Sequence, residues 1–272
     1  MFKKQLVFTK KFLVEIWEAD TLREELNRKK SYNEYFHHFS KFHDISNIEA
    51  EYENAHLFFK ENIEKYLPKI SSASFIDLGC GLGHTLYSLK KLGYVDTLGI
   101  DINSDCINFC KQKDFNVKKT SILDFLKNST KKFDVILAFD VIEHFHKDEA
   151  TKIVELIKTR LKKNGLMLLL LPNANNLSNF RLRYMDITHE VFYTPESITQ
   201  LIRNGGFDNF KIIGLRYFTV SSKSKKWALT KSFLALPAYL LSEFFHKIFY
   251  LSIGLTEIQL VSPKMLVLCI AK

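Results

Sequence analysis

The chain has 272 residues, of which 46% are hydrophobic and 25% are charged, and its formal net charge is +9. These values are ordinary for a globular protein, and the length allows one large α/β domain with an appendage or two small domains. The charge favours an anionic partner, whereas the lack of ~18 consecutive apolar residues excludes a transmembrane helix and the lysine-interrupted N-terminal run excludes a signal peptide.

Apolar periodicity and turn residues divide the chain into a helical start and a region of alternating strands and helices. Residues 1–47 read as a helical extension, and residues 48–66 as a helix that stops before Pro68. From residue 73 onward, strands are predicted at residues 75–78, 97–101, near 117, 133–139 and 166–171, with helices at 84–92, 105–113 and 149–163. A further helix starts with Thr194 as N-cap and Pro195 at its first position, and two last strands follow at 210–218 and 265–271. This alternation predicts a parallel, doubly wound sheet.

The turn after the first strand carries the clearest site signal, the sequence D-L-G-C-G-L-G at residues 77–83. Glycines at a strand-to-helix turn let a backbone approach a ligand closely. The second strand ends in Asp101, which can accept hydrogen bonds from the ribose hydroxyls of an adenosine. A dinucleotide site requires G-x-G-x-x-G, but the sixth position from Gly79 is His84. The acid Asp77 suits instead a cofactor with a positively charged amino-acid end.

Several motifs in the correct order resemble those of the class I S-adenosylmethionine-dependent methyltransferases. Residues 77–83 and 99–101 resemble motifs I and II, residues 134–144 resemble motif IV in its D-V-(I/L)-E-H form, and residues 161–171 resemble the turn and fifth strand. The resemblance covers residues 48–218. It implies a Rossmann-like α/β fold, a seven-stranded and mostly parallel sheet in the order 3-2-1-4-5-7-6, and helices on both faces.

The same resemblance implies S-adenosylmethionine as the cofactor. The implied cofactor-binding residues are Asp77, Gly79, Cys80, Gly81, Gly83, Asp101, Ile102, Ser121, Ile122, Phe139 and Asp140. The family usually has an acid after the third strand, near the adenine amino group, and Ser121 stands at that position here. Asp124, three residues further on, is the alternative adenine contact.

A segment after the fifth strand predicts the acceptor. Residues 186–194 resemble the D-x-T-H-x-x-x-(F/Y)-(S/T) signature of a bacterial subgroup of sugar and polysaccharide methyltransferases. The resemblance implies O-methylation of a hydroxyl on a sugar, a nucleotide sugar or a cell-surface glycan precursor. Arg181, Arg183 and Tyr184 precede the signature and are the candidate substrate-binding residues, since a guanidinium can grip a phosphate or carboxylate bidentately.

Other functions remain open. One is a small-molecule O-methyltransferase of the quinone type, another is an RNA or protein methyltransferase, and a third is a cofactor-binding regulatory scaffold without enzymatic activity. No N/D-P-P-Y/F tetrad follows the fourth strand and no appended nucleic-acid module is recognisable, so we expect no nucleic-acid partner.

Two histidines are candidate catalytic residues, because a hydroxyl nucleophile must lose a proton. His189 lies in the acceptor signature and is the preferred base, and His144 follows the fourth strand. Asp140, Glu143 and His144 stand at i, i+3 and i+4, so a helical turn would place them on one face. They could hold a divalent metal, but we favour helix capping by Asp140 and Glu143.

Residues 222–257 form an apolar, lysine-flanked insert between the last two strands. It predicts an amphipathic helix that binds a membrane surface peripherally, covers the substrate pocket as a lid, or forms a dimer interface. We therefore expect a cofactor cap at residues 1–47, a methyltransferase core at 48–221 and 258–272, and this insert.

The four cysteines form no C-x-x-C pair, which is typical of reduced thiols in a cytoplasmic protein. Lipid binding by the insert would place the protein at the inner face of the membrane.

Overall fold

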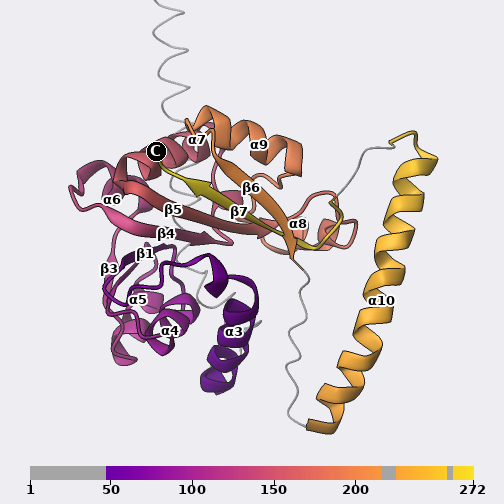
Figure 1. Cartoon of the computed structure of the whole chain (residues 1–272), viewed down its shortest axis with the longest axis horizontal. Coiled ribbons are helices and arrows are strands. Elements are labelled where there is room, and N and C mark those ends of the chain that lie inside the picture. Colours follow the sequence, from indigo (N-terminus) through magenta and orange to yellow (C-terminus); the bar gives the residue numbers. More distant parts are fainter. Residues whose placement is uncertain (1–46, 216–224, 256–259) are drawn as a thin grey trace, which may run out of the picture.

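The computed structural model describes residues 47–215, 225–255 and 260–272. Its seven strands form one sheet in the order β3-β2-β1-β4-β5-β7-β6 (Figure 1). β7 runs antiparallel to β5 and β6, and the pairs among β1 to β5 are parallel. The predicted order is therefore confirmed. The strands are β1 (Ser74–Leu78), β2 (Asp96–Asp101), β3 (Val117–Lys119), β4 (Phe133–Phe139), β5 (Leu161–Pro172), β6 (Phe210–Leu215) and β7 (Lys264–Ile270).

Helices cover both faces of the sheet, as predicted. The face above the sheet in Figure 1 carries α6 (Ile122–Asn128), α7 (Lys147–Arg160) and α9 (Pro195–Asn204), and the face below it carries α3 (Ile48–Asn62), α4 (His84–Lys91) and α5 (Ser104–Gln112). Short 3₁₀ turns, η2 (Glu64–Tyr66) and η3 (Ile142–His144), follow α3 and β4. The result is a three-layer α/β architecture.

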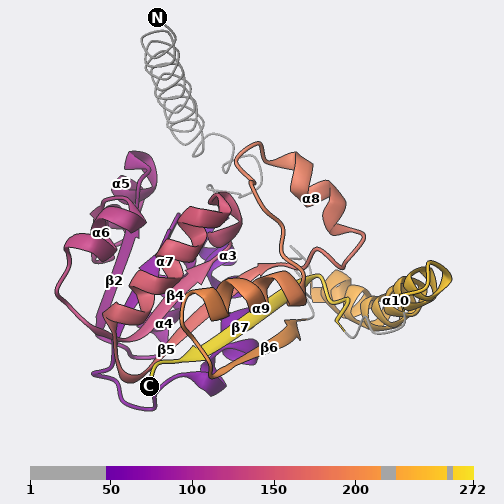
Figure 2. The ribbon, with the colours of Figure 1, turned by 90° about the horizontal axis from the view of Figure 1, so that it is seen from above.

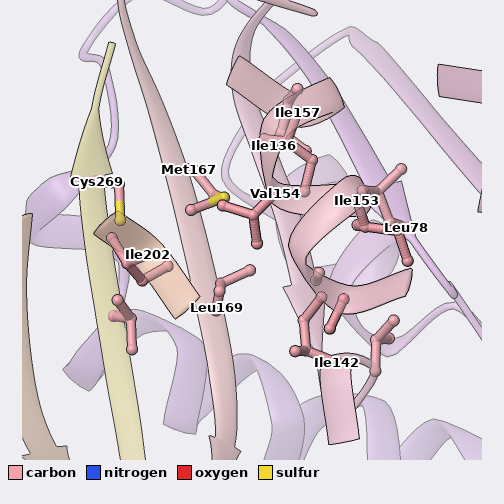
Figure 3. Packing of buried hydrophobic residues seen from close by; sticks show 14 of the residues in the cluster. Leu78, Ile136, Ile142, Ile153, Val154, Ile157, Met167, Leu169, Ile202 and Cys269 are labelled. Carbon is pink, nitrogen blue, oxygen red and sulfur yellow. The ribbon is translucent and has the colours of Figure 1, made fainter. Parts of the chain in front are cut away.

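The core follows from the alternation of side chains along each strand. Ile136 and Met167 point to the α7 side of the sheet, where they pack with Ile153 and Ile157 (Figure 3). Their chain neighbours Val135 and Leu168 point to the other face and join the cluster around α3 and α4. Strands buried on both faces explain the near-continuous apolar sequence of β4 and β5. Burial of each such Leu or Ile side chain stabilises the folded state by about 1.5–3 kcal/mol.

Local capping explains where two of the helices begin. The Asn103 side chain accepts hydrogen bonds from the backbone N–H groups of Asp105 (2.8 Å) and Cys106 (3.0 Å) at the start of α5. Thr194 forms a capping box with Ser197 at the start of α9, which confirms the predicted N-cap.

The predicted helix at residues 149–163 is wrong at its C-terminal end. α7 stops at Arg160, and β5 begins at Leu161, which pairs with Phe133 and is buried. Asn164 then adopts a positive φ of 59°, and the register of β5 against β4 shifts there. Pairing and burial of Leu161 therefore override the helical periodicity that continues through the lysines.

α10 (Lys225–Ser252) occupies the predicted insert, and Figures 1 and 2 both show it beside the layered body rather than over a face of the sheet. No helix in residues 47–215, 225–255 or 260–272 is long and apolar enough to cross a membrane. The N-terminal cofactor cap, apart from Asn47, lies outside the described residues, as do 216–224 and 256–259. The division into cap, core and insert stays a prediction.

Candidate active site

The candidate site lies at the edge of the sheet where the parallel strands end. β1 ends at Leu78, β2 at Asp101 and β4 at Phe139, so the loops that follow share one edge. The antiparallel strand β7 starts at the same edge, because Lys264 pairs with Pro172 at the end of β5. Open α/β sheets bind ligands at this edge.

The glycine loop has a backbone that side chains would strain. Gly79, Gly81 and Gly83 have φ values of +74°, +49° and +85°. A Cβ on Gly79 would lie 2.7 Å from Val141 Cγ2, so this glycine permits close packing within the protein. A Cβ on Gly81 would meet nothing within 4 Å. Gly81 therefore borders open space at the edge where the strands end.

Hydrogen bonds within the loop argue against a phosphate ligand. The N–H groups of Gly79 and Cys80 donate to Ile100 O, and that of Gly83 donates to Cys80 O. The Gly81 N–H donates to Asp101 Oδ2 at 2.9 Å. These four groups are thus already satisfied inside the protein, whereas a pyrophosphate site requires N–H groups that point at the ligand. The loop fits S-adenosylmethionine, which has no phosphate.

Asp77 and Asp101 place two carboxyl groups beside the loop. Asp77 is 2% exposed, and burial, followed by the nearby Asp101, raises its pKa to about 7. Burial also raises the pKa of Asp101, although the backbone N–H groups of Asn103 and Gly81 oppose this rise. A carboxylate has about four acceptor positions, so Asp101 can bind ribose hydroxyls besides these two N–H groups. The pair fits a cofactor with both a cationic end and a ribose.

The other predicted cofactor residues fall into two groups. Ile102 follows Asp101 at the strand edge and is an exposed large apolar residue, which suits contact with an adenine face. Ile122 and Cys80 are buried, and Phe139 packs against Phe59 with 6.2 Å between ring centroids. These three residues pack in three separate hydrophobic clusters, and their contact with the cofactor stays a prediction.

Ser121 is the N-cap of α6. Its hydroxyl accepts a hydrogen bond from the Asp124 N–H at 3.0 Å and donates to Asp124 Oδ2 at 2.6 Å. Ser121 thus holds the Asp124 carboxylate at the helix start. The adenine contact, by Ser121 or by Asp124, stays a prediction.

The predicted grouping of Asp140, Glu143 and His144 on one helical face is wrong. Asp140 has a φ of +53° and lies before the 3₁₀ turn η3, whose N-cap is Val141 with no side-chain capping bond. The Asp140 carboxylate pairs with Lys264 Nζ, 124 residues further along the chain. The left-handed backbone at Asp140 therefore turns this acid toward β7, and the predicted capping roles of Asp140 and Glu143 are also wrong.

His144 and His189 lie together, with 4.7 Å between their ring centroids. Thr188 Oγ1 donates to Asp186 Oδ1 at 2.6 Å, so at 2.8 Å it must accept from His144 Nδ1. His189 Nδ1 lies 2.8 Å from the Leu182 carbonyl oxygen, which can only accept. Both imidazoles therefore carry their proton on Nδ1, and the lone pair is on Nε2.

Burial keeps both imidazoles neutral. It lowers the pKa of His144 to about 4, with a further contribution from His189, and it lowers the pKa of His189 below its ordinary value. Asp186 beside them remains ionised, because its hydrogen bonds from Thr188 outweigh the burial that would raise its pKa. The Asp186–Thr188 pair thus orients His144 from behind.

Glu143 completes a cluster with the two histidines. It is 1% exposed, and neither carboxyl oxygen has a hydrogen-bond partner in the described part of the chain. Burial, followed by repulsion from Asp140, raises its pKa to about 8. One ligand atom each of Glu143, His144 and His189 lies within 4.8 Å of the others. A buried carboxyl and two imidazoles held through their Nδ1 protons fit a divalent cation, so His189 replaces Asp140 in the predicted metal set.

The predicted substrate-binding residues lie on α8 (Asn179–Met185). Arg183 donates from Nη2 to the Glu190 carbonyl at 2.8 Å and from Nη1 to the His189 carbonyl. Its guanidinium therefore holds the loop that carries His189 instead of facing a substrate. Arg181 is exposed, and Tyr184 is 71% exposed with its ring 5.0 Å from that of Phe180.

Sequence reasoning missed one polar group of the site, the Tyr193 hydroxyl. Tyr193 is buried, and its hydroxyl has no hydrogen-bond partner among the residues described. Burial, followed by the charge of Glu143, raises its pKa to about 12. Tyr193 stands at the aromatic position of the signature at residues 186–194. That position in the signature was the sequence feature that could have identified Tyr193 as a residue of the site.

Comparison with known proteins agrees with this geometry. A family model described as a methyltransferase domain matches residues 49–212. The mitochondrial ubiquinone biosynthesis O-methyltransferase of Saccharomyces cerevisiae is 31% identical over 136 residues, which are 46% of this chain and 42% of that protein. The tRNA U34 carboxymethyltransferase of Campylobacter jejuni subsp. doylei is 28% identical over 119 residues, 41% of this chain and 40% of the relative. Each of these two matches thus spans less than half the length of the relative.

Solved structures share the fold. The crystal structure of a SAM-dependent methyltransferase from Archaeoglobus fulgidus superposes with a TM-score of 0.57 and 22% identity, covering 82% of this chain and 97% of that one. The family match extends over more than half of the chain and includes the glycine loop, Asp101 and the Glu143–His144 pair. The chain therefore belongs to the methyltransferase-domain family, with S-adenosylmethionine as its cofactor.

Proposed function

We propose that this protein transfers the methyl group of S-adenosylmethionine to a hydroxyl oxygen of an acceptor bound at Glu143, His144 and His189. The observation that carries the proposal is the pair of neutral imidazoles with Nε2 lone pairs at the carboxyl edge, beside the glycine loop. The acceptor oxygen attacks the sulfonium methyl group in line, which forms a methyl ether and S-adenosylhomocysteine. The acceptor proton leaves to a base.

His189 is the proposed base. It is partly exposed, and its pKa is lowered less drastically than that of His144, which burial brings to about 4. An imidazole whose conjugate acid is so unfavourable accepts a proton poorly, so His144 acts as a positioning residue. In this arrangement the Leu182 carbonyl holds the Nδ1 proton of His189 and directs Nε2 to the acceptor.

A divalent cation at the same cluster is the alternative way to activate the hydroxyl. Glu143, His144 and His189 would hold it, and it would lower the pKa of a bound hydroxyl as a Lewis acid. Calorimetric titration with Zn²⁺ or Mn²⁺ tests this role without an activity assay. Binding that Glu143→Gln loses, and that Glu155→Gln keeps, supports the metal; no binding by the wild type leaves His189 as the base.

The acceptor that we propose is a small molecule with a hydroxyl group, of the quinone-precursor type. The yeast relative named for ubiquinone biosynthesis supports this class. The exposed apolar side chains of Phe180, Tyr184 and Ile187 near the His189 loop also suit an apolar acceptor. The sugar or glycan acceptor rests on the signature at residues 186–194 alone.

The test is methyl transfer from labelled S-adenosylmethionine to a panel of acceptors. We expect label in phenols and catechols, and we include nucleotide sugars for the glycan alternative. tRNA belongs in the panel because one relative is a tRNA-modifying enzyme and the chain carries a net charge of +9. Transfer to tRNA alone would overturn the small-molecule proposal. Cofactor binding without transfer to any acceptor would favour the regulatory scaffold.

A further inference from the structure

The C-terminal half of α10 exposes a wide apolar surface. Its large apolar side chains are between 44% and 61% exposed: Leu240, Leu241, Phe244, Phe245, Ile248, Phe249 and Leu251. Ile253 and Leu255 extend the exposed apolar run beyond the helix. Contiguous exposed apolar surface of this kind marks a contact with another molecule or a membrane.

Polar contacts fix which side of α10 faces the protein. His246 is buried, its Nδ1 donates to the Ser242 carbonyl at 2.6 Å, and its Nε2 accepts the Leu177 N–H at 2.9 Å. Tyr250, one turn further on, donates from its hydroxyl to the Asn175 carbonyl at 2.8 Å. These bonds attach one polar side of the helix to the segment that leads into α8.

The apolar surface lies on the opposite side of the helix. At about 100° per residue, Leu241, Phe244 and Ile248 project away from the direction of His246 and Tyr250. Together with the other exposed apolar positions they cover about half of the helix circumference. Figure 1 shows this helix standing apart from the sheet, so none of the described helices and strands of the body covers that side.

Charge distinguishes the two partners that could cover this surface, a second copy of the chain and a membrane. α10 contains four lysines, Lys225, Lys226, Lys231 and Lys247, and one acid, Glu243. Lys247 is exposed and stands three and four positions from Phe244 and Leu251, at the edge of the apolar surface. A second copy would bring two basic helices together, whereas each lysine near an anionic bilayer contributes about 1 kcal/mol.

We propose that α10 lies in the plane of an anionic membrane surface, with Leu241, Phe244, Phe245 and Ile248 among the lipid chains. The helix does not cross the bilayer, in keeping with the lack of a spanning helix among the described residues. Lys247 at the edge of the apolar surface contacts lipid phosphates, and the His246 and Tyr250 bonds hold the body against the other side of the helix.

This placement also links the membrane to the acceptor site. Asn175 and Leu177, to which α10 is bonded, lead into α8, where the Leu182 carbonyl orients His189. If the proposed hydroxyl methylation holds, an apolar acceptor dissolved in the lipid enters beside α8 without crossing water. This second part rests on the proposed function, whereas membrane binding itself does not.

The experiment is co-sedimentation of the full chain with phosphatidylcholine vesicles, with and without phosphatidylglycerol. We expect binding to the anionic vesicles that weakens at high salt, and little binding to the neutral ones. Phe245→Glu should lower the binding at least about tenfold. The matched control is Val95→Glu, which adds the same charge at a 79% exposed apolar residue between α4 and β2; it should bind nearly as the wild type does.

Two outcomes would overturn the proposal. One is that the wild type binds neither kind of vesicle, or that Phe245→Glu binds as well as the wild type does. The other is that the exposed apolar surface of α10 forms a dimer instead. In that case the wild type would be a dimer in sedimentation velocity, Phe245→Glu would be a monomer, and neither would bind vesicles. Calorimetry with S-adenosylmethionine shows that each variant is folded, and it separates failure of membrane binding from failure of methyl transfer.

Discussion

Glu143 and His144 are adjacent in the chain, and burial shifts their pKa values in opposite directions. The pKa of Glu143 rises to about 8 and that of His144 falls to about 4, because in each case burial disfavours the charged form. At pH 7 Glu143 is thus mostly an acid with a proton to donate, and His144 is a neutral imidazole. Groups with pKa values shifted this far are common at catalytic sites, where their chemistry offsets their cost to folding.

Glu143→Gln is expected to stabilise the fold more at pH 8 than at pH 5. The unfolded carboxyl ionises near its ordinary pKa of 4.5, but the folded one keeps its proton up to about pH 8. The unfolded wild type therefore binds fewer protons between these values, so its folding stability falls as pH rises through this window. The free energy of unfolding of the variant should exceed that of the wild type by about 1–3 kcal/mol at pH 8.

Urea unfolding at both pH values measures this gain. Glu155→Gln is the matched control, because Glu155 is a solvent-accessible acid on α7 that pairs with Lys152 at 2.9 Å. The control should change stability little and equally at both pH values. A gain for Glu143→Gln that does not depend on pH would contradict the raised pKa.

His189→Asn is expected to lower the rate of methyl transfer by about 10²–10⁴-fold while cofactor binding is kept. The pKa of His189 is lowered, so the wild-type rate should be level near pH 7 and fall only below pH 6.5 as the imidazole gains a proton. The pH profile of kcat measures this, and the variant should lose the acidic limb. His146→Asn is the control, because the His146 side chain is 56% exposed and its Nδ1 lies 3.5 Å from Glu190, the residue after His189. An unchanged profile in His189→Asn would exclude it as the base.

At the scale of elements, the glycine loop shows how one sequence motif performs two tasks. Gly79 is required for packing, because its Cβ would collide with Val141. Gly81 instead borders open space, because no atom of the described residues lies within 4 Å of its Cβ position. The motif itself does not tell these tasks apart, because both glycines share the left-handed backbone.

Gly81→Ala and Gly93→Ala form a matched pair. Both glycines have a positive φ, +49° and +86°, and a Cβ on either meets nothing within 4 Å. Each substitution should therefore destabilise the fold by about 1–2 kcal/mol through backbone strain. Only Gly81→Ala should weaken S-adenosylmethionine binding in calorimetry, by about tenfold or more, since Gly93 lies at the end of α4. Equal affinities would place the cofactor elsewhere.

At the scale of the whole molecule, the cofactor loop joins elements that bury much of the core. β1 and β2 flank the loop, and Asp101 of β2 accepts the Gly81 N–H. A ligand bound to this loop stabilises the folded state as a whole, because the unfolded chain has no such site. The core should therefore respond to cofactor as one cooperative unit.

S-adenosylmethionine or S-adenosylhomocysteine at 100-fold its Kd should raise the folding free energy by about 2.7 kcal/mol. For a domain of this size each kcal/mol raises Tm by about 2–4 °C. Thermal unfolding followed by circular dichroism measures the shift, with NAD as the control ligand, since the loop has its N–H groups occupied. A Tm shift with NAD and none with S-adenosylmethionine would contradict the assignment of the loop.

Sequence alone determined the fold class and the cofactor loop of this protein, and the family resemblance implied the strand order. The first two depend on neighbours close in the chain: apolar runs that end in glycines, an acid at the end of the second strand, and helices between the strands. Local patterns of this kind restrict backbone conformation and side-chain faces directly, so the family resemblance that they carry was confirmed by the family match. The positions of caps such as Thr194 followed from the same local rules.

Only the tertiary structure decided which groups meet in the candidate site. His144 and His189 come together across 45 positions, and Asp140 leaves the predicted cluster to pair with Lys264 on the antiparallel strand. Arg183 holds backbone carbonyls, although its position before the signature indicated a substrate contact. The spacing i, i+3, i+4 predicts neighbours only where a helix forms, and a positive φ at Asp140 interrupts it. Contacts between distant residues depend on how the strands and loops pack, which no local pattern encodes.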